Sequence, residues 1–371
     1  MAFEFDRTPL PGEAYRAVGR MTLGDLEVIR LILRGSSVVD WRRLHFQAPA
    51  EVDDFLRLNQ FELSDPRDER RLRSVLAQAV EYLRKAFGYR VAEPVARPRD
   101  IRELFLLASG AIEPRRYRRI GCVVLKCMHV VHHLEARELL FRTAIREADL
   151  AERVDRRVTA EARRMRQLGL PVVEFVGNVK TRSSLVTKLL AKRETVAAQI
   201  FDRVRYRIVT ERQDQIPSIL HHLGRTLFPF NYVVPGQTQN TLVRFRDVLA
   251  RHPDAKAIVG ELQAPLDVEA RDVRPVNLFS GRQYRVLNFV VDLPVRIDEM
   301  LPPAGPLVED LGRIVFSLVE FQIVDAATAK RNEEGESSHA RYKRRQGRNV
   351  LRRLSRGLVV PKRRKRGKEQ R

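Results

Sequence analysis

The sequence is poor in the features that mark secreted and membrane-spanning proteins. It has 2 cysteines in 371 residues, which argues against a disulfide framework and agrees with a reducing compartment. No apolar run approaches the roughly 20 residues of a membrane span. The N-terminal stretch, residues 1–13, is acidic and lacks the apolar core of a signal peptide. These absences predict a cytoplasmic protein with no membrane partner.

Acidic residues are almost missing from the C-terminal tail. From Arg341 onward, Glu369 is the only acid among many Arg and Lys residues, and no aromatic residue follows Tyr342. The whole chain carries a formal net charge of +22. The tail is either a solubilising extension or an electrostatic arm that binds RNA, the ribosome or DNA by releasing counterions. The lack of aromatic residues argues against base stacking in the tail.

The first part of the chain has the texture of a helical protein. Thr22 and Asp25 form a capping-box pattern ahead of an apolar helix that runs to Gly35. Apolar spacing predicts further helices over 66–87 and 101–107, and helical spacing continues from 116 to 168.

After Pro171 the texture changes to strands separated by helices. Alternating apolar runs predict strands over 172–176, 200–209, 284–291 and 314–324, and helices over 183–192 and 215–227. The length of 371 residues and the hydrophobic content of 44% suit two modules with a large core. We therefore predict an α+β protein with a helical domain of unassigned role (1–168), a mixed β-sheet flanked by helices (169–345) and a basic, disordered tail (346–371).

The most specific motif spans residues 319–343. Glu320 and Gln322 lie on the same face of an otherwise apolar strand, where a carboxylate and an amide suit a metal and a polar ligand. The segment is in register with the closing motif of the RelA/SpoT family of alarmone synthetases, V-E-x-Q-I-R-T, a spacer and G-x-A-A-H-x-x-Y-K. The residues that match it are Glu320, Gln322, Ile323, Gly335, His339, Tyr342 and Lys343. The chain thus resembles that family.

Two further segments resemble the family's phosphate-binding motifs, in the family's order. The first motif, G-R-x-K-x-x-x-S-I-x-x-K, is matched by Gly177, Asn178, Lys180, Ser184, Leu185 and Lys188. The second, D-x-x-G-x-R-I, is matched by Asp202, Arg207 and Ile208, with Arg205 in the place of the glycine. Strand alternation groups Asp202 with Val204, Tyr206 and Ile208, so this carboxylate needs a metal or a salt bridge with an arginine.

A third segment resembles the family's guanine-binding motif, G-Y-x-S-I-H-x-V-V. It is matched by Tyr284, Arg285, Leu287, Val290 and Val291, with Asn288 in the place of the histidine. On a strand, Tyr284 and Asn288 share a face, which would set an aromatic ring for base stacking beside an amide. The structural alternative is that Tyr284 packs in the protein interior.

The resemblance implies a Mg²⁺-dependent pyrophosphokinase. Such an enzyme moves the β,γ-pyrophosphate of ATP to the 3′-hydroxyl of a guanine nucleotide, GDP or GTP. By resemblance, Asp202 and Glu320 would be catalytic and hold Mg²⁺, and Glu320 could take the proton of the attacking hydroxyl. The remaining matched residues would bind the nucleotides: Lys180, Ser184, Lys188 and Arg207 the ATP phosphates, and Tyr284, Asn288 and Gln322 the acceptor.

The chain departs from the family pattern at three positions that would touch nucleotide. Asn178 and Val324 each replace an arginine, and Asn288 replaces a histidine. Two alternatives therefore stay open beside the alarmone synthetase. One is a catalytically silent RNA-binding or regulatory protein on the same fold, and the other is pyrophosphate transfer to an RNA 3′ end.

A cluster of potential metal ligands lies in the helical region, between residues 122 and 135. On a helix, Cys122 and Cys127 point well over 100° apart, and Cys122 and His129 are roughly 10 Å apart along the axis. That separation is too long for a shared zinc with bonds of about 2 Å. His129 and His133 remain as a possible two-ligand pair, with His132 and Glu135 nearby. The region is better explained as a helical packing or regulatory domain.

Overall fold

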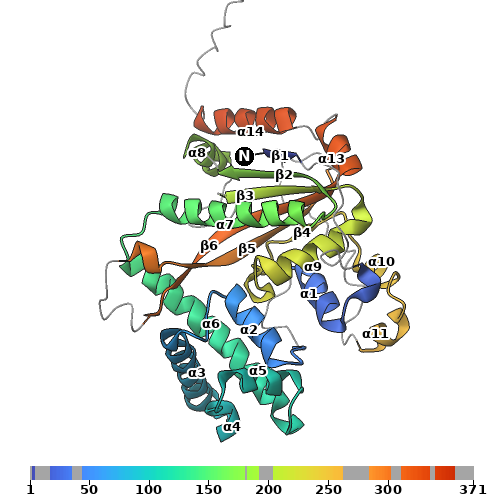
Figure 1. Ribbon diagram of the computed structural model, residues 1–371. Coiled ribbons are helices and arrows are strands. Elements are labelled where there is room, and N and C mark those ends of the chain that lie inside the picture. The colour runs from blue at the N-terminus through green and yellow to red at the C-terminus, as the bar shows by residue number, and fades with distance from the viewer. Residues whose placement is uncertain are drawn as a thin grey trace, which may run out of the picture.

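The computed structural model describes residues 2–4, 17–35, 44–179, 182–191, 204–261, 284–301, 311–334 and 339–355. Its centre is a six-stranded mixed sheet in the order β1-β2-β3-β6-β5-β4 (Figure 1). The strands are β1 (Ala2–Glu4), β2 (Val172–Val179), β3 (Val204–Thr210), β4 (Gln239–Asn240), β5 (Leu287–Arg296) and β6 (Ile314–Asp325). The predicted α+β class is therefore consistent with the described structure.

The strands that carry the motifs lie side by side in this sheet. β3 pairs with β6 in parallel, so that Arg205 is the register partner of Glu320. β5 pairs with β6 antiparallel over ten residues, with Asn288 opposite Gln322. β2 flanks β3 antiparallel and sets Asn178 opposite Arg205. Four stretches that are far apart in sequence thus meet on neighbouring strands.

The two faces of the sheet differ in chemistry because side chains alternate along each strand. One face carries Tyr206, Phe289 and Phe321, which are fully buried, and the Phe321 ring stacks with the other two at centroid distances of 5.9 and 5.6 Å. Helices α6 (Arg118–Arg142), α7 (Glu147–Gln167) and α9 (Ile216–Thr226) pack against the sheet, with α7 and α9 lying across this face (Figure 1). The opposite face carries the polar residues of the motifs.

Several helices begin and end where the sequence predicts. Helix α1 (Leu23–Arg34) starts with the Thr22–Asp25 capping box and ends at Gly35, whose φ of 61° is the left-handed conformation that glycine tolerates best. Helix α3 (Pro66–Phe87) has the predicted bounds. The stretch 116–168 forms two helices, α6 and α7, that are separated by residues 143–146.

The other described helices have between 4 and 16 residues. They are α2 (Pro49–Leu58), α4 (Glu93–Ala96), α5 (Ile101–Ser109), α8 (Arg182–Ala191), α10 (Phe245–Leu249), α11 (Ala255–Glu261), α13 (Ala326–Glu333) and α14 (His339–Leu354). None of the helices in the described ranges is long and apolar enough to cross a bilayer.

The expected division between a helical domain (1–168) and a sheet domain (169–345) stays a prediction, and two contacts of the described structure cross it. The extreme N-terminal strand, β1, pairs with β2, so the segment predicted to be helical also contributes to the sheet. One continuous hydrophobic cluster runs from α1 to β6. Secondary structure does change type between α7 and β2, but the buried core does not stop there.

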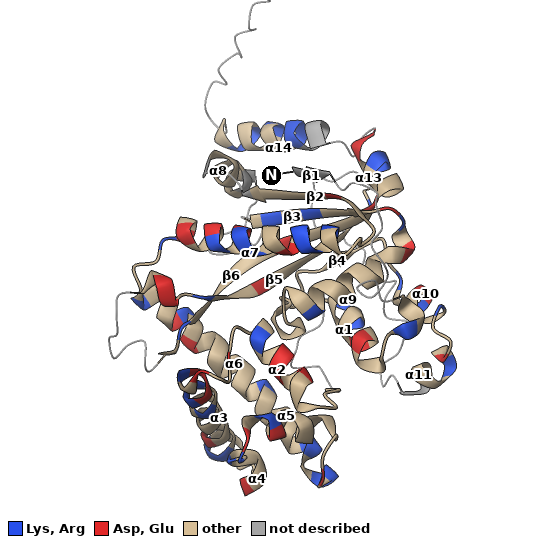
Figure 2. Cartoon of the chain, in the orientation of Figure 1, with Lys and Arg blue, Asp and Glu red and all other residues tan. Residues whose placement is uncertain are grey.

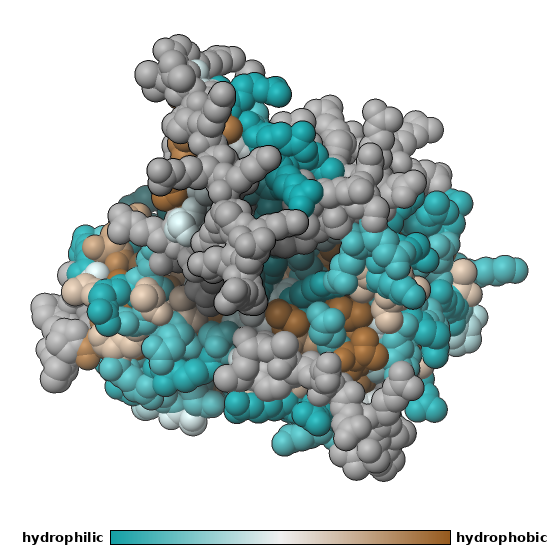
Figure 3. Space-filling model, turned by 90° about the horizontal axis from the view of Figure 1, so that it is seen from above, coloured by the Kyte–Doolittle hydropathy of each residue, from teal (hydrophilic) through white to brown (hydrophobic). Residues whose placement is uncertain are grey.

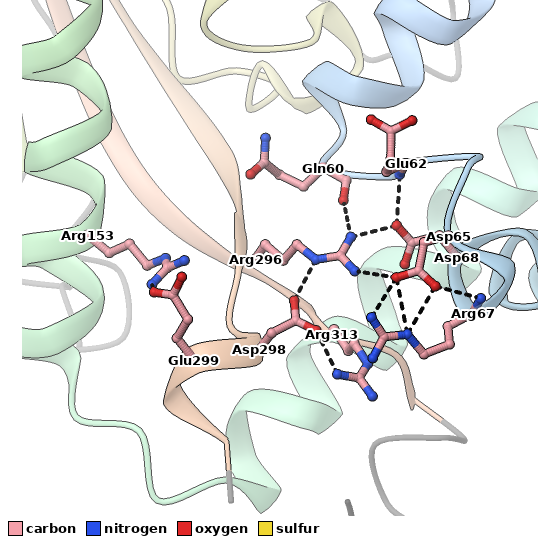
Figure 4. Close-up of polar contacts among 10 residues, drawn as sticks. All are labelled: Gln60, Glu62, Asp65, Arg67, Asp68, Arg153, Arg296, Asp298, Glu299 and Arg313. Carbon is pink, nitrogen blue, oxygen red and sulfur yellow. Dashed lines mark hydrogen bonds and ion pairs between the residues drawn. The ribbon is translucent and has the colours of Figure 1, made fainter. Parts of the chain in front are cut away.

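An ion-pair network ties the helical part to the sheet (Figure 4). The guanidinium of Arg296, the last residue of β5, contacts the carboxylates of Asp68 and Asp298 at 2.5 Å each and that of Asp65 at 3.4 Å. Asp65 is the N-cap of α3. Arg313, just before β6, also donates to Asp298. The network fixes the start of α3 against the ends of β5 and β6.

Strand β5 begins and ends later than predicted. The run over 284–291 becomes Leu287–Arg296, and it contains Pro294. Proline has no N–H to donate, but β4 pairs with β5 only at Leu287 and Asn288. Val233 also forms an isolated bridge to Val291. In the described sheet, the stretch of β5 beyond Val291 therefore has an edge where proline is tolerated.

The basic tail, predicted to be disordered from residue 346, is helical through Leu354. Helix α14 packs against α8, yet Val186, Leu190, Leu351 and Leu354 stay partly exposed. Basic residues recur along α14, α7 and β3 (Figure 2). The part of the upper face that is not grey mixes hydrophilic and hydrophobic residues (Figure 3). The first turns of the tail therefore form an amphipathic helix. The number of charged residues in the tail does not by itself predict this helix.

Candidate functional site

Glu320 is the centre of the polar face of the sheet. Its side chain is only 6% exposed, although it sits on a face opposite the aromatic core. The guanidinium Nε of Arg205 donates to Glu320 Oε2 at 2.6 Å. This contact follows from the parallel register, which makes the two residues direct neighbours on adjacent strands. Both charges are thus partly desolvated and compensate each other.

Two amides surround the second oxygen of the same carboxylate. Asn288 donates from Nδ2 to Glu320 Oε1 at 2.7 Å, and Gln322 approaches Oε1 from Nε2 at 3.4 Å. The amide oxygen Oδ1 of Asn288 is buried, and none of the described residues gives it a hydrogen bond. A buried oxygen without a donor is costly in free energy. This corner of the sheet therefore suits a bound cation or a ligand that carries an N–H or O–H group.

Arg207 lies two residues further along β3 on the same face. Its guanidinium contacts the carboxylate of Glu333 in α13 at 3.0 Å, and that carboxylate is 66% exposed. Because this ion pair is exposed to water, it contributes little to stability and can open to an incoming anion. Arg205 and Arg207 thus give the polar face two cationic side chains, two residues apart on the same strand.

Strand β2 brings Asn178 to this face, opposite Arg205. Helix α8 follows after two residues and begins at Arg182, so that Ser184 lies in its first turn and is exposed. The expected helix 183–192 is therefore displaced by one residue at each end. Lys188 lies within α8. Asn178 and Ser184 come from adjoining elements, as the motif spacing predicts.

Tyr284 is not on strand β5 as expected. It precedes the first strand residue, Leu287, by three positions. Its ring packs against a small apolar cluster that includes Val209, Val286 and Val324. The alternation argument that paired Tyr284 with Asn288 on one strand face is therefore wrong, and the contacts agree with the packing interpretation of this tyrosine.

Two residues of the predicted site, Lys180 and Asp202, lie outside the described residues, as does Gly335. The sequence grouped Asp202 with Val204, Tyr206 and Ile208, and these three face the aromatic core. Glu320 is on the other face, beside Arg205. The expected convergence of Asp202 with Glu320 therefore stays a prediction. The alternation of side chains along β3 does not support it, because it groups Asp202 with residues of the opposite face.

The matched glycine of the first motif has a packing role that the sequence did not reveal. A Cβ atom added to Gly177 would lie 2.8 Å from Cε1 of Tyr206 on the neighbouring strand. The Tyr206 hydroxyl donates to Asp155 of α7 at 2.8 Å, and burial raises the pKa of this tyrosine. Gly177 thus leaves room for a ring that connects the sheet to α7. No pattern within one strand encodes this contact.

The histidine cluster of the helical region does not assemble a metal site among the described residues. The His129 and His133 rings stack at a centroid distance of 6.2 Å, but His133 pairs with Asp292 of β5 at 2.6 Å. His129 and His132 line an apolar cavity of about 100 Å³. Burial lowers the pKa of His129 to about 4 and that of His132 to about 3. His129 and His132 are therefore neutral packing groups.

The chemistry of the polar face can be tested against the Mg²⁺ that the family resemblance implies. Mg²⁺ prefers oxygen ligands and is often held by one or two carboxylates. Glu320 offers a carboxylate, and Asn288 offers a buried amide oxygen that receives no hydrogen bond from the described residues. These two residues fit part of such a site. A second carboxylate, predicted to be Asp202, belongs to the stretch outside the described residues.

Comparison with solved structures gives distant neighbours, among them small alarmone synthetases. No family model matches the chain, and no curated protein matches it. The small alarmone synthetase 1 of Bacillus subtilis is 14% identical over 55% of this chain and 86% of its own, with a TM-score of 0.30. The small alarmone synthetase 2 of the same organism is 14% identical over 60% and 98%, with a TM-score of 0.27. The same synthetase 1 bound to its product pppGpp is 13% identical over 65% and 95%, also with a TM-score of 0.27.

At these identities and TM-scores, the likeness is too distant to carry an argument about fold or function. The resemblance to the RelA/SpoT family thus continues to depend on the motifs and on where the described strands bring them.

Proposed function

We propose that the chain is a nucleotide pyrophosphokinase that acts on the polar face of its sheet. The proposal takes the donor to be ATP and the acceptor to be the 3′-hydroxyl of GDP or GTP. The observation that carries it is the meeting of Arg205, Arg207, Asn288, Glu320 and Gln322 on one face, although they come from three separate motifs. Random placement of these motifs would scatter them over both faces of the sheet.

Each of these groups has a task in such a transfer. The guanidinium of Arg207 can release the exposed carboxylate of Glu333 and bind phosphate oxygens in a fork geometry. The amides of Asn288 and Gln322 can orient the acceptor through hydrogen bonds. Glu320 Oε1 accepts the proton of the acceptor's 3′-hydroxyl when that hydroxyl takes the place of one amide N–H at this oxygen. Mg²⁺, held by Glu320, Asn288 and Asp202, would offset charge on the phosphate oxygens.

The test is incubation of the full chain with ATP labelled on the γ-phosphate, Mg²⁺ and one acceptor at a time. The acceptors are GDP, GTP and bulk tRNA. Pyrophosphate transfer predicts AMP and labelled acceptor in equal amounts, whereas phosphatase activity would release labelled phosphate and ADP. Absence of a labelled product with every acceptor would overturn the proposal, and labelling of tRNA alone would identify transfer to an RNA 3′ end.

Two variants make the test specific to the polar face. Arg207→Gln should lower the transfer rate by roughly tenfold or more, because a charge-assisted contact to phosphate is lost. Arg163→Gln is the matched control, since Arg163 is an exposed residue of α7, on the helix that covers the other face. Equal losses in both variants would indicate general electrostatic attraction rather than a site.

The Arg205–Glu320 ion pair favours a second candidate function. A carboxylate that is engaged by a guanidinium at 2.6 Å is less able to accept a proton or a metal ion. The family pattern has glycine where Arg205 stands, so this pair is particular to the chain. On this basis the alternative is a catalytically silent protein that keeps the fold and binds RNA or another regulatory partner.

A further inference from the structure

A cationic cavity lies at the far end of strand β5 from the polar face. Its volume is about 410 Å³, and it is lined by four arginines, one glutamate, one glutamine and two valines. Arg296, in its wall, is six residues along β5 from Val290, the register partner of Glu320. At about 3.4 Å per residue the two places are roughly 20 Å apart. The cavity is therefore separate from the proposed transferase site.

Three of the arginines come from one side of helix α7. Arg153, Arg156 and Arg157 have the i, i+3, i+4 spacing that places side chains next to one another on a helix. Val154, between them, is buried and anchors the helix in the core. The fourth arginine, Arg296, reaches the cavity from the end of β5, beside the backbone of Gln60 (Figure 4).

The positive charges of the cavity are only partly compensated. Arg296 is paired with Asp68 and Asp298, and Arg153 with Glu299 at 2.6 Å. Arg157 instead donates to two neutral backbone carbonyls, those of Pro294 at 2.7 Å and Leu227 at 2.6 Å.

Arg156 is exposed and has no carboxylate of the described residues in contact, although the contact from Arg153, together with the charge of Arg156, lowers the pKa of Glu299. Within the described structure, two guanidinium groups of the cavity thus have no carboxylate in contact.

Burial makes this arrangement costly for Arg157. Desolvation lowers the pKa of its guanidinium to about 10, and only the more distant charge of Glu161 opposes the shift. An anion in the cavity would restore the lost stabilisation of the charged form. Backbone carbonyls hold the guanidinium of Arg157 in place in advance, so little side-chain entropy is lost when a ligand binds.

We propose that this cavity binds a polyphosphate anion. A guanidinium presents a rigid fork of donors that matches two phosphate oxygens. The guanidinium of Arg156 and the remaining N–H groups of Arg157, on one side of the helix, match adjacent phosphoryl groups better than a single small anion. The volume lies within the range of about 300–1,000 Å³ found for ligand pockets. The polyphosphate is either free or the phosphate chain of a nucleotide, and the proposal does not depend on the transferase activity.

The experiment measures binding of inorganic pyrophosphate to the full chain by calorimetry at fixed ionic strength. The matched variants are Arg156→Gln and Arg163→Gln, two exposed arginines seven residues apart on α7, of which only the first lines the cavity. Saturable binding to a site that depends on Arg156 is expected. Arg156→Gln should weaken it about tenfold or more, as for loss of a charged hydrogen bond, and Arg163→Gln should leave it unchanged. Arg156→Glu should weaken it further.

Several outcomes would overturn the proposal. They are the absence of saturable binding, equal weakening by Arg156→Gln and Arg163→Gln, and equally tight binding of citrate. A third variant, Arg207→Gln, separates this cavity from the polar face of the sheet. Pyrophosphate binding that is lost in Arg207→Gln but kept in Arg156→Gln would place the anion at the sheet face and overturn the assignment.

A parallel titration with ATP identifies the source of the polyphosphate. Weakening of ATP binding by Arg156→Gln to the same degree as pyrophosphate binding indicates the chain of a nucleotide. Weakening of pyrophosphate binding alone indicates the free anion.

Discussion

Replacement of Glu320 by glutamine separates the structural from the chemical role of the polar face. Glu320→Gln removes the charge that compensates Arg205 but keeps the size of the side chain and an acceptor for Asn288. Breaking a fully buried ion pair costs about 3–5 kcal/mol. Here the Glu320 side chain is 6% exposed but that of Arg205 is 29% exposed, so water can partly solvate the remaining guanidinium. We expect a loss of roughly 2 kcal/mol in the free energy of unfolding.

For a chain of this length, that loss corresponds to a melting temperature lower by roughly 3 °C. Glu333→Gln is the matched control, because Glu333 pairs with Arg207 on the same face but is 66% exposed. Its expected cost is below about 0.5 kcal/mol. Denaturant unfolding of Glu320→Gln, Arg205→Gln and the double variant measures the coupling energy of the pair, and Glu333→Gln is unfolded in parallel as the control.

A coupling energy of about 1–3 kcal/mol would agree with the geometry. An unchanged stability in Glu320→Gln, with a coupling energy near zero, would refute the reasoning that the ion pair is structural. Transfer of pyrophosphate is measured on the same preparations. If the unmutated chain is active and the Glu320→Gln variant is folded but inactive, the carboxylate of Glu320 also takes part in the transfer reaction.

Three further predictions concern other parts of the molecule. Gly177→Ala should destabilise by about 1–3 kcal/mol in denaturant unfolding, because the added Cβ would meet the Tyr206 ring at 2.8 Å; Gly347→Ala, in α14, meets nothing within 4 Å and should not destabilise. His132 should contribute a loss of roughly 2 kcal/mol in the free energy of unfolding from pH 7 to pH 4.5, because the unfolded side chain takes up a proton near pH 6.5 while the folded state holds its pKa at about 3. His129, with a folded pKa of about 4, should add a similar loss. His132→Phe should therefore reduce the pH slope by about half, and an unchanged slope would contradict the assignment. Deletion of residues 356–371, which keeps α14, should weaken RNA binding and reduce its salt dependence, and unchanged RNA affinity would leave the tail as a solubilising extension.

The sequence by itself determined those helices and strands that are set by caps and by the periodicity of apolar residues. The Thr22–Asp25 box and Gly35 predicted both ends of α1, and the apolar spacing of 66–87 predicted α3, because caps and helical periodicity act within a few residues. The alternation in 314–324 predicted β6 almost to its ends. It also placed Glu320 and Gln322 on one strand face.

Only the tertiary structure decided which residues meet across strands. The parallel register of β3 and β6 makes Arg205 the partner of Glu320, and a shift by one residue would turn every side chain to the other face. The fit of Tyr206 over Gly177 and the cavity between α7 and β5 depend in the same way on packing between distant segments. Such contacts leave no periodic trace in a single sequence, because each strand records only which of its residues are buried and not what they are buried against.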